Sequence, residues 1–184
     1  MHNIVTQIDL LDEILEPWQE IIGDDFQGYK NHVLRMLNYC FYLVHPEPHE
    51  KEILIIAAAF HDIGIWSTGK LNPDYIPQSI IELEIYLEQF EKFKSIDDIT
   101  FIVENHHKIG KIKEVPSHFL AEMFRIADLA DLSLGFFNND IPKAYIKKVK
   151  EMFPNAGFHK RLWKLTLMQL KSNPLNPLPM MHWK

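Results

Sequence analysis

Apolar positions recur at helical spacing along most of the chain. In residues 26–44, apolar side chains at positions 33, 34, 37, 41 and 44 mark one face of a helix, and His45 and Pro46 should end it. The segment 53–60 holds only apolar residues, so a helix over 50–63 is expected to be buried at the centre of the fold. Convincing alternation of apolar and polar residues is absent. The pattern predicts an all-α fold class with a single compact helical bundle.

Six further helices are expected, at residues 4–22, 78–93, 97–107, 117–134, 142–153 and 158–171. Pro17 should interrupt the first of them. Residues 67–77 and 108–116 are expected to form loops, and the proline-rich tail after residue 171 to run in extended form along the surface. We expect one domain over 1–184, with a core at about 26–135 flanked by an N-terminal helix, C-terminal helices and this tail.

The charge balance and the use of cysteine exclude several classes of protein. Net charge is −6, from 19 basic and 25 acidic residues, so a nucleic-acid polymer is not expected as a partner. Cys40 is the one cysteine, which rules out an internal disulfide and a zinc cluster of cysteines. The first residues lack the pattern of a signal peptide, and no uncharged apolar run reaches about 18 residues. These features predict a cytoplasmic protein without membrane contact, and they leave its oligomeric state open.

The candidate chemistry lies where the long apolar run ends. His61 and Asp62 directly follow Phe60, at the end of the helix that is expected to be buried. A buried polar side chain must be hydrogen-bonded, paired or bound to a metal. The dipeptide therefore offers one nitrogen ligand and one oxygen ligand side by side in the core.

Two further candidate ligands come from other expected helices. His32 lies early in the helix over 26–44, and Asp128 follows Phe124 and Leu120 by four and eight residues, on the apolar face of its helix. With the dipeptide they make a set of two nitrogen and two oxygen ligands. Such a set suits a divalent metal without choosing among Fe, Mn, Ni, Co, Zn and Mg. Asp131 is the alternative to Asp128, or it can instead accept a hydrogen bond from a ligand histidine.

The order His, His-Asp, Asp across successive helices resembles the HD-domain superfamily of metal-dependent phosphohydrolases. The resemblance covers residues 26–135 and rests on His32, LIIAAAFHDIG at 54–64, ENHHK at 104–108 and RIADLADL at 125–132. The chain is more closely similar to an uncharacterised bacterial branch of HD-domain proteins. That branch carries HHKI, an RxADxxDxSxG segment, a GFH motif (here 157–159) and a PLxPLPM ending, and it brings no settled activity.

The resemblance implies a helical HD-domain fold with a hydrolytic site. The residues that match the metal ligands of the motif, which would hold one divalent ion, are His32, His61, Asp62 and Asp128. Such an ion lowers the pKa of a bound water and polarises a phosphoryl oxygen. Beside Asp62, the expected catalytic residues are His106 and His107, one of which would donate a proton or contact phosphate. Three cations are candidates for binding phosphate: Arg125, Lys108 and Arg35.

The chain departs from the family pattern at two points. Members with two metals use an additional histidine after the HD dipeptide and then a His-His pair; here the pair is present, but residues 75–80 hold no histidine. One metal is therefore favoured over two. Ile65 and Trp66 stand where other members carry charged residues.

We expect a phosphohydrolase acting on a small phosphorylated molecule or a nucleotide, although these departures leave alternatives open. One is an HD-scaffold enzyme of another class, such as a hydratase, a lyase or a di-iron oxygenase. Another is a non-catalytic, metal-containing module that binds a ligand.

Overall fold

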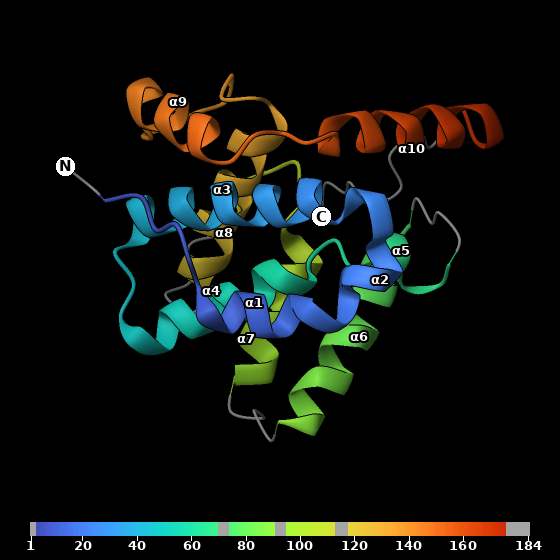
Figure 1. Cartoon of the computed structure of the whole chain (residues 1–184), viewed down its shortest axis with the longest axis horizontal. Coiled ribbons are helices and arrows are strands. Elements are labelled where there is room, and N and C mark those ends of the chain that lie inside the picture. Colours follow the sequence, from blue (N-terminus) through green and yellow to red (C-terminus); the bar gives the residue numbers. More distant parts are fainter. Residues whose placement is uncertain (1–2, 70–73, 91–94, 113–117, 176–184) are drawn as a thin grey trace.

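The computed structural model describes residues 3–69, 74–90, 95–112 and 118–175, and its regular elements are helices (Figure 1). The all-α fold class is confirmed. The longer helices are α3 (Phe26–Val44), α4 (Pro48–Phe60), α6 (Ile76–Gln89), α7 (Ile96–Asn105), α8 (Phe119–Leu132), α9 (Lys143–Met152) and α10 (Phe158–Ser172). The shorter helices are α1 (Asp9–Leu15), α2 (Gln19–Ile22) and α5 (Gly64–Ser67), and 3₁₀ turns lie at Glu16–Trp18 and Gly23–Asp25.

Turn residues set most of the helix boundaries. α3 has the predicted bounds and ends where His45 adopts a left-handed conformation, with φ of 52°. The first predicted helix breaks at Pro17 as expected, but it begins at Asp9 rather than at residue 4. α6 begins at Ile76 rather than at residue 78, because Pro77 fits the first turn of a helix, where its missing N–H is not needed. The predicted loop residues 113–116 and the tail from residue 176 lie outside the described residues.

The helix predicted over 50–63 ends three residues earlier than predicted, and a second, short helix follows it. α4 ends at Phe60, and α5 begins at Gly64. Between them the chain makes a tight bend, in which the N–H of Ile63 bonds to the carbonyl of Phe60. The apolar pattern continues through this bend, which explains why the sequence does not reveal it. The bend places His61 and Asp62 at the end of a helix inside the core.

α4 is the central helix of the bundle. It contacts α1, α3, α6, α7 and α8, and its residues from Ile53 to Phe60 are all buried. Because its apolar surface runs all round the helix, it can be surrounded on every side. Whatever follows its C-terminal end is therefore held in the interior.

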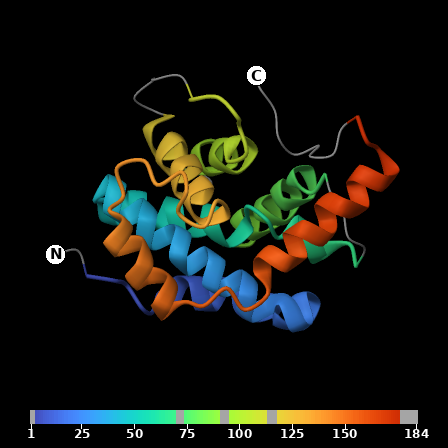
Figure 2. The ribbon, with the colours of Figure 1, turned by 90° about the horizontal axis from the view of Figure 1, so that it is seen from above.

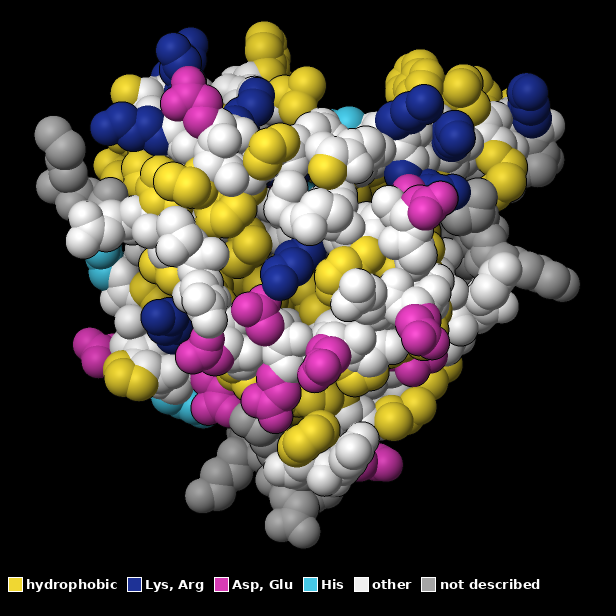
Figure 3. All heavy atoms as spheres, in the orientation of Figure 1, with side chains coloured by type: hydrophobic (Ala, Val, Ile, Leu, Met, Phe, Trp, Pro, Cys, Tyr) yellow, Lys and Arg dark blue, Asp and Glu magenta, His cyan; other side chains and the backbone are white. Residues whose placement is uncertain are grey.

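The remaining helices form layers about α3 and α4. α9 and α10 lie on one side of α3, whereas α6 and α7 lie on the other side of the bundle (Figure 1). Seen from above, α9 runs beside α3 and α10 turns away from it (Figure 2). Lys and Arg side chains gather along the edge that α9 and α10 form, and Asp and Glu lie mostly lower on this face (Figure 3). None of the described helices is both long enough and apolar enough to cross a membrane.

A glycine allows the turn before α10 to approach α3. A Cβ atom at Gly28 would lie 2.9 Å from the carbonyl oxygen of Ala156 and 3.2 Å from the backbone nitrogen of Phe158. A larger residue would therefore push the turn away. The close approach seats the ring of Phe158 on that of His32, with centroids 4.1 Å apart and planes at 15°. One side of the candidate metal centre is thus covered by an aromatic ring.

Candidate metal centre

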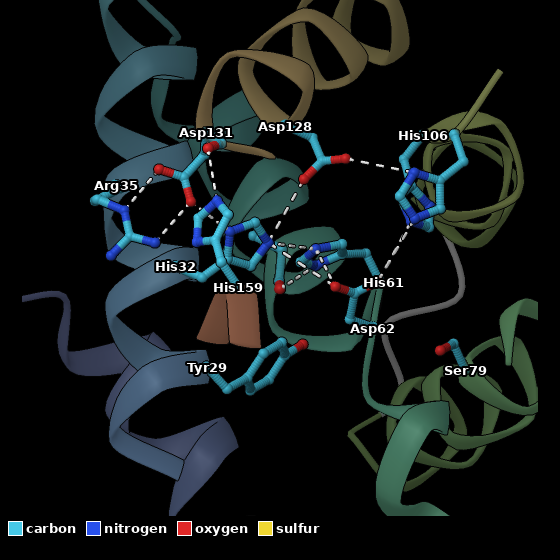
Figure 4. Close-up of polar contacts among 12 residues, drawn as sticks. Tyr29, His32, Arg35, His61, Asp62, Ser79, His106, Asp128, Asp131 and His159 are labelled. Atoms are coloured by element: carbon cyan, nitrogen blue, oxygen red, sulfur yellow. Dashed lines mark hydrogen bonds and ion pairs between the residues drawn. The ribbon is translucent and has the colours of Figure 1, made fainter. Parts of the chain in front are cut away.

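The four predicted metal ligands converge from three parts of the chain. His61 and Asp62 lie at the end of α4, His32 comes from α3, and Asp128 comes from α8 (Figure 4). Nε2 of His32 lies 3.0 Å from Nε2 of His61 and 3.5 Å from Oδ1 of Asp128. Nε2 of His61 lies 3.4 Å from Oδ2 of Asp62. All four side chains are buried. The ligand-type atoms of His32, His61 and Asp62 lie within 4.8 Å of one another, and Asp128 lies beside this group, in contact with His32.

The hydrogen bonds of the two histidines leave both Nε2 atoms free to bind a cation. Nδ1–H of His32 donates to Oδ2 of Asp131 at 2.8 Å, and Nδ1–H of His61 donates to the carbonyl of Ala58 at 2.8 Å. In a neutral imidazole the second nitrogen is then a lone pair. Two lone pairs 3.0 Å apart repel each other unless a positive charge, either a proton or a metal ion, lies between them. The pair is therefore a cation site.

The pKa values of these groups follow the same logic. Burial lowers the pKa of His32 to about 4, even though Asp131 opposes the shift. Burial also lowers the pKa of His61, but the charge and hydrogen bond of Asp62 outweigh it and raise that pKa to about 9. Burial raises the pKa of the Asp62 carboxyl, yet its histidine neighbours hold it well below its usual range. Without a metal, one proton therefore resides on the histidine pair.

A second group of ligands lies beside the first. His106 and His107 directly follow α7, and Nδ1–H of His106 donates to the carbonyl of Val103 at 2.6 Å. Nε2 of His106 lies 3.5 Å, and Nε2 of His107 4.0 Å, from Oδ1 of Asp62. Asp62 thus presents Oδ2 to His32 and His61 and Oδ1 to the second histidine pair.

Within the part of the chain that the structure describes, three buried atoms of this cluster have no hydrogen-bond partner: Oδ1 of Asp62, Nε2 of His106 and Oδ1 of Asp128. Leaving such atoms unpaired costs about 1–3 kcal/mol each, so proteins rarely leave them unused. A metal ion would satisfy lone pairs of this kind. The residues of both triads fit a metal, since in each triad the ligand atoms lie within 4.8 Å of one another: His32, His61, Asp62; and Asp62, His106, His107.

Asp131 supports the site and does not enter it. Its carboxylate accepts from His32 and forms two parallel bonds with Arg35, from Nε at 2.6 Å and from Nη2 at 2.7 Å. These bonds lower the pKa of Asp131 to about 2 against the raising effect of burial. A charged carboxylate of this kind orients the histidine and makes it a stronger ligand. Asp131 therefore has the supporting role that the sequence left open.

The interpretation of Arg35 as a phosphate-binding residue is wrong. Its guanidinium is buried, bonded to Asp131 and donating to the carbonyls of Phe153 and Pro154, the former at 3.0 Å. It does not line the cavity beside the site. Its helical position, three residues after His32, directs it to the same interior face and into the network that holds the histidine.

Arg125 and Lys108 lie at the cavity, as their predicted role requires. The guanidinium of Arg125 is already paired with Glu122, at 2.9 Å from Nε and 2.8 Å from Nη2. Glu122 also accepts from the backbone N–H of Ile112 at 2.9 Å. Arg125 therefore anchors the chain that follows α7 and contributes positive charge at the cavity. No ion pair is found for Lys108 within the described residues.

A cavity of about 420 Å³ opens beside the cluster. Its polar lining includes Asp62, His106, His107 and Asp128, and the rest of its wall comes from α8, α10 and the segments that follow α7 and α8. A volume of this size accommodates a small molecule. The side chains of Asp62, Asp128 and the second histidine pair thus face the cavity, whereas His32 and His61 lie behind them and do not line it.

Tyr75 is a residue of the site that the sequence pattern does not reveal. Its hydroxyl and Nε2 of His107 form a hydrogen bond of 2.6 Å, and Tyr75 lines the cavity. Burial and the charge of Asp62 raise its pKa, so the hydroxyl keeps its proton. Residues 75–80 match no pattern of metal ligands, so only the packing of the helices identifies this side chain.

Gly64 explains how Tyr75 reaches the site. A Cβ atom at Gly64 would lie 2.3 Å from the carbonyl oxygen of Tyr75 and 2.7 Å from the nitrogen of Ser79, so no other residue fits there. The N–H of Gly64 donates to Oγ of Ser79 at 2.9 Å. Gly64 thus allows the start of α6 to pack against the start of α5.

Comparison with protein-family models, with curated proteins and with solved structures finds no match for this chain.

Proposed function

We propose that this protein is a metal-dependent phosphohydrolase that cleaves a small phosphorylated molecule. The observation that carries the proposal is the cluster of buried atoms without partners among the described residues, beside two imidazole Nε2 atoms 3.0 Å apart that must share either a proton or a metal ion. Its position at the end of a cavity of about 420 Å³ supports a role in catalysis rather than in stability alone. The motif pattern supports membership of the HD-domain superfamily, which is part of the same proposal.

The residues of the first triad, with Asp128, would hold one divalent ion. When bound, such an ion supplies a Lewis acid and a water molecule of lowered pKa. Asp131 and Arg35 hold the ring of His32 in place, and the carbonyl of Ala58 holds that of His61. The chain therefore fixes the ligand atoms before the substrate arrives, which reduces the cost of reorganisation during the reaction.

Groups on the cavity side would handle the substrate. Lys108 and Arg125 supply positive charge for the phosphoryl oxygens. The hydroxyl of Tyr75, which is hydrogen-bonded to His107, can deliver its proton to the leaving oxygen. In the hydrolysis the P–O ester bond breaks and a water oxygen bonds to phosphorus. The leaving oxygen takes up a proton, so the products are an alcohol and phosphate.

The test begins with elemental analysis of the purified protein, followed by a phosphatase and nucleotidase panel with the metal found. We also expect activity with at least one of Mn²⁺, Co²⁺, Ni²⁺, Fe²⁺ or Mg²⁺ after removal of the native metal. Asp62→Ala should abolish this activity with a modest loss of stability. Phosphate release from no substrate with any of these metals would overturn the proposal.

A centre with two metals is the second candidate. The two carboxylate oxygens of Asp62 face different histidine pairs, as a bridging ligand requires. Against it, Nε2 of His107 is already hydrogen-bonded to the hydroxyl of Tyr75, which leaves the second triad with one histidine fewer. Metal stoichiometry separates the two. One ion per chain supports the mononuclear site, and two irons with an oxygen-dependent visible spectrum would instead indicate a di-iron oxygenase.

A further inference from the structure

The wall of the cavity differs in chemistry from its metal-binding end. Six apolar side chains line it, contributed by α8, α10 and the segments after α7 and α8: Ile109, Leu129, Leu132, Phe137, Leu162 and Leu165. Apart from Thr166, the polar residues of the lining lie at the metal-binding end of the cavity. They are the ligand-type side chains themselves, or residues close to them in the sequence or in space. Beyond the phosphate end, a bound molecule would thus contact mostly hydrocarbon.

Thr166 offers little to a polar substrate. Its hydroxyl donates to the carbonyl of Leu162 within α10, at 3.1 Å. A sugar or a nucleobase carries several donors and acceptors that are hydrated in water. Against the described part of this wall they would lose those hydrogen bonds without replacement, which disfavours binding. A hydrocarbon group loses nothing there and is driven into the cavity by the hydrophobic effect.

We propose that the substrate is a phosphate monoester with an apolar organic part, bound with its phosphoryl group at the metal-binding cluster and its hydrocarbon against α8 and α10. This inference rests on the proposed phosphohydrolase function and names its substrate class. The cavity volume of about 420 Å³ suits a medium alkyl chain or an aromatic ring. Hydrolysis of such an ester yields inorganic phosphate and an apolar alcohol or phenol.

The test compares ethyl, butyl and hexyl phosphate with phenyl phosphate, glycerol phosphate and AMP, on protein loaded with its native metal. Each buried methylene should raise kcat/KM roughly fourfold, so hexyl phosphate should exceed ethyl phosphate by at least about tenfold if two of its four additional methylenes are buried, and by about 250-fold if all four are. Glycerol phosphate and AMP should be poorer substrates than butyl phosphate. Equal or better hydrolysis of the polar esters would overturn the inference and leave the phosphohydrolase proposal standing.

Binding of alkylphosphonates provides a readout that does not depend on turnover, because their C–P bond is not hydrolysed. Calorimetry should show tighter binding of hexylphosphonate than of ethylphosphonate, by at least about tenfold, and the ratio should persist when a chelator removes the metal. If the ratio appears but no ester is cleaved with any metal, the apolar site stands and the phosphohydrolase proposal fails. If the ratio is absent, the apolar site fails.

A matched pair of variants tests the position of the hydrocarbon. Leu162→Trp places a large ring at the wall, so it should abolish the dependence of phosphonate binding on chain length. Leu167→Trp makes the same change on the same helix, at a side chain that is 39% exposed and does not line the cavity, and it should retain the dependence. Circular dichroism and metal content confirm that both variants are folded. Retention of the dependence in folded Leu162→Trp would contradict the proposed placement.

Discussion

The buried polar cluster has two halves that differ in how completely their hydrogen bonds are satisfied. In the half that lies away from the cavity, Asp131 bonds to both His32 and Arg35, and the remaining guanidinium nitrogen donates to backbone carbonyls. In the half that lines the cavity, Asp62, His106 and Asp128 each keep one buried atom without a partner. Figure 4 shows the two halves on either side of the His32–His61 pair.

This difference separates support from reactivity. A fully bonded network is rigid and holds its members in one arrangement. Unpaired buried atoms are costly to the protein, and their gathering at one cavity indicates that a ligand satisfies them. The charge of the site is arranged accordingly, since the low pKa of Asp131 (about 2) keeps it ionised behind His32, whereas burial and the charge of Asp62 raise the pKa of Asp128.

The largest effect should come from the carboxylate that faces both histidine pairs. Asp62→Ala removes Oδ1 and Oδ2 together, so phosphatase kcat/KM should fall by about 10³-fold or more, on the scale of losing one member of a catalytic unit. Metal content, measured by elemental analysis, should fall with it. Asp24→Ala, at an exposed aspartate, is the control and should leave both unchanged. If the wild-type protein shows no activity and Asp62→Ala lowers the melting temperature strongly, the metal is structural rather than catalytic.

Breaking the supporting half should act on stability first. Arg35→Met leaves the carboxylate of Asp131 buried without its cation, which should lower the free energy of unfolding by about 3–5 kcal/mol. Looser support of His32 should also weaken metal binding about 10–100-fold. Urea unfolding and metal titration measure the two effects. The double variant Arg35→Met/Asp131→Leu should recover stability but not metal affinity; recovery of both would refute the supporting role of Asp131.

The metal-free protein should be most stable near pH 6.5. His32 has a pKa of about 4 in the folded protein and of 6.5 in the unfolded chain. Between these two pH values only the unfolded chain binds the proton, so the free energy of unfolding decreases as the pH falls from 6.5 to 4. His61 has a pKa of about 9 in the folded protein and of 6.5 in the unfolded chain. Between these two pH values only the folded protein binds the proton, so the free energy of unfolding decreases as the pH rises from 6.5 to 9. Each flank should amount to about 3 kcal/mol in urea unfolding.

Metal binding should change this pH profile on one side. The ion replaces the proton on the histidine pair, so the alkaline flank should disappear, and binding at pH 7 should release about one proton. Calorimetry in buffers with different ionisation enthalpies counts that proton. An alkaline flank that is unchanged by metal would show that the ion binds elsewhere.

The smallest of these effects concerns the hydroxyl on the cavity side. Tyr75→Phe removes the proposed proton donor, so kcat should fall by about 10²-fold, at the low end for loss of a general acid, while metal content stays at one ion per chain. Tyr39→Phe is the matched control, because its buried hydroxyl has no hydrogen-bond partner. A second bound ion in Tyr75→Phe would show that the tyrosine keeps the site mononuclear by occupying His107. An unchanged kcat would exclude Tyr75 as the donor.

The sequence alone predicted the all-α fold, most of the longer helices and the buried His and Asp residues that the structure brings together. Periodicity depends on local geometry, so it located α3 with its bounds, identified α4 as the central helix, and placed His32 and Asp128 on faces that turn inward. It also indicated that Asp131 can accept a bond from a histidine. These inferences needed only the spacing of residues within one helix.

The packing of the helices decided which side chains from different helices meet, and the spacing of residues within one helix contains no information about this. Arg35 and His32 share an inward face, but only the packing of α3 on α8 and on the chain after α9 decides that the arginine meets Asp131 rather than the cavity. Tyr75 reaches His107 because the glycine at position 64 lets two helices approach. The apolar wall joins α8 to α10, about 30 residues further along the chain. Local sequence sets which way a side chain leaves its helix, and the packing of helices sets what it meets there.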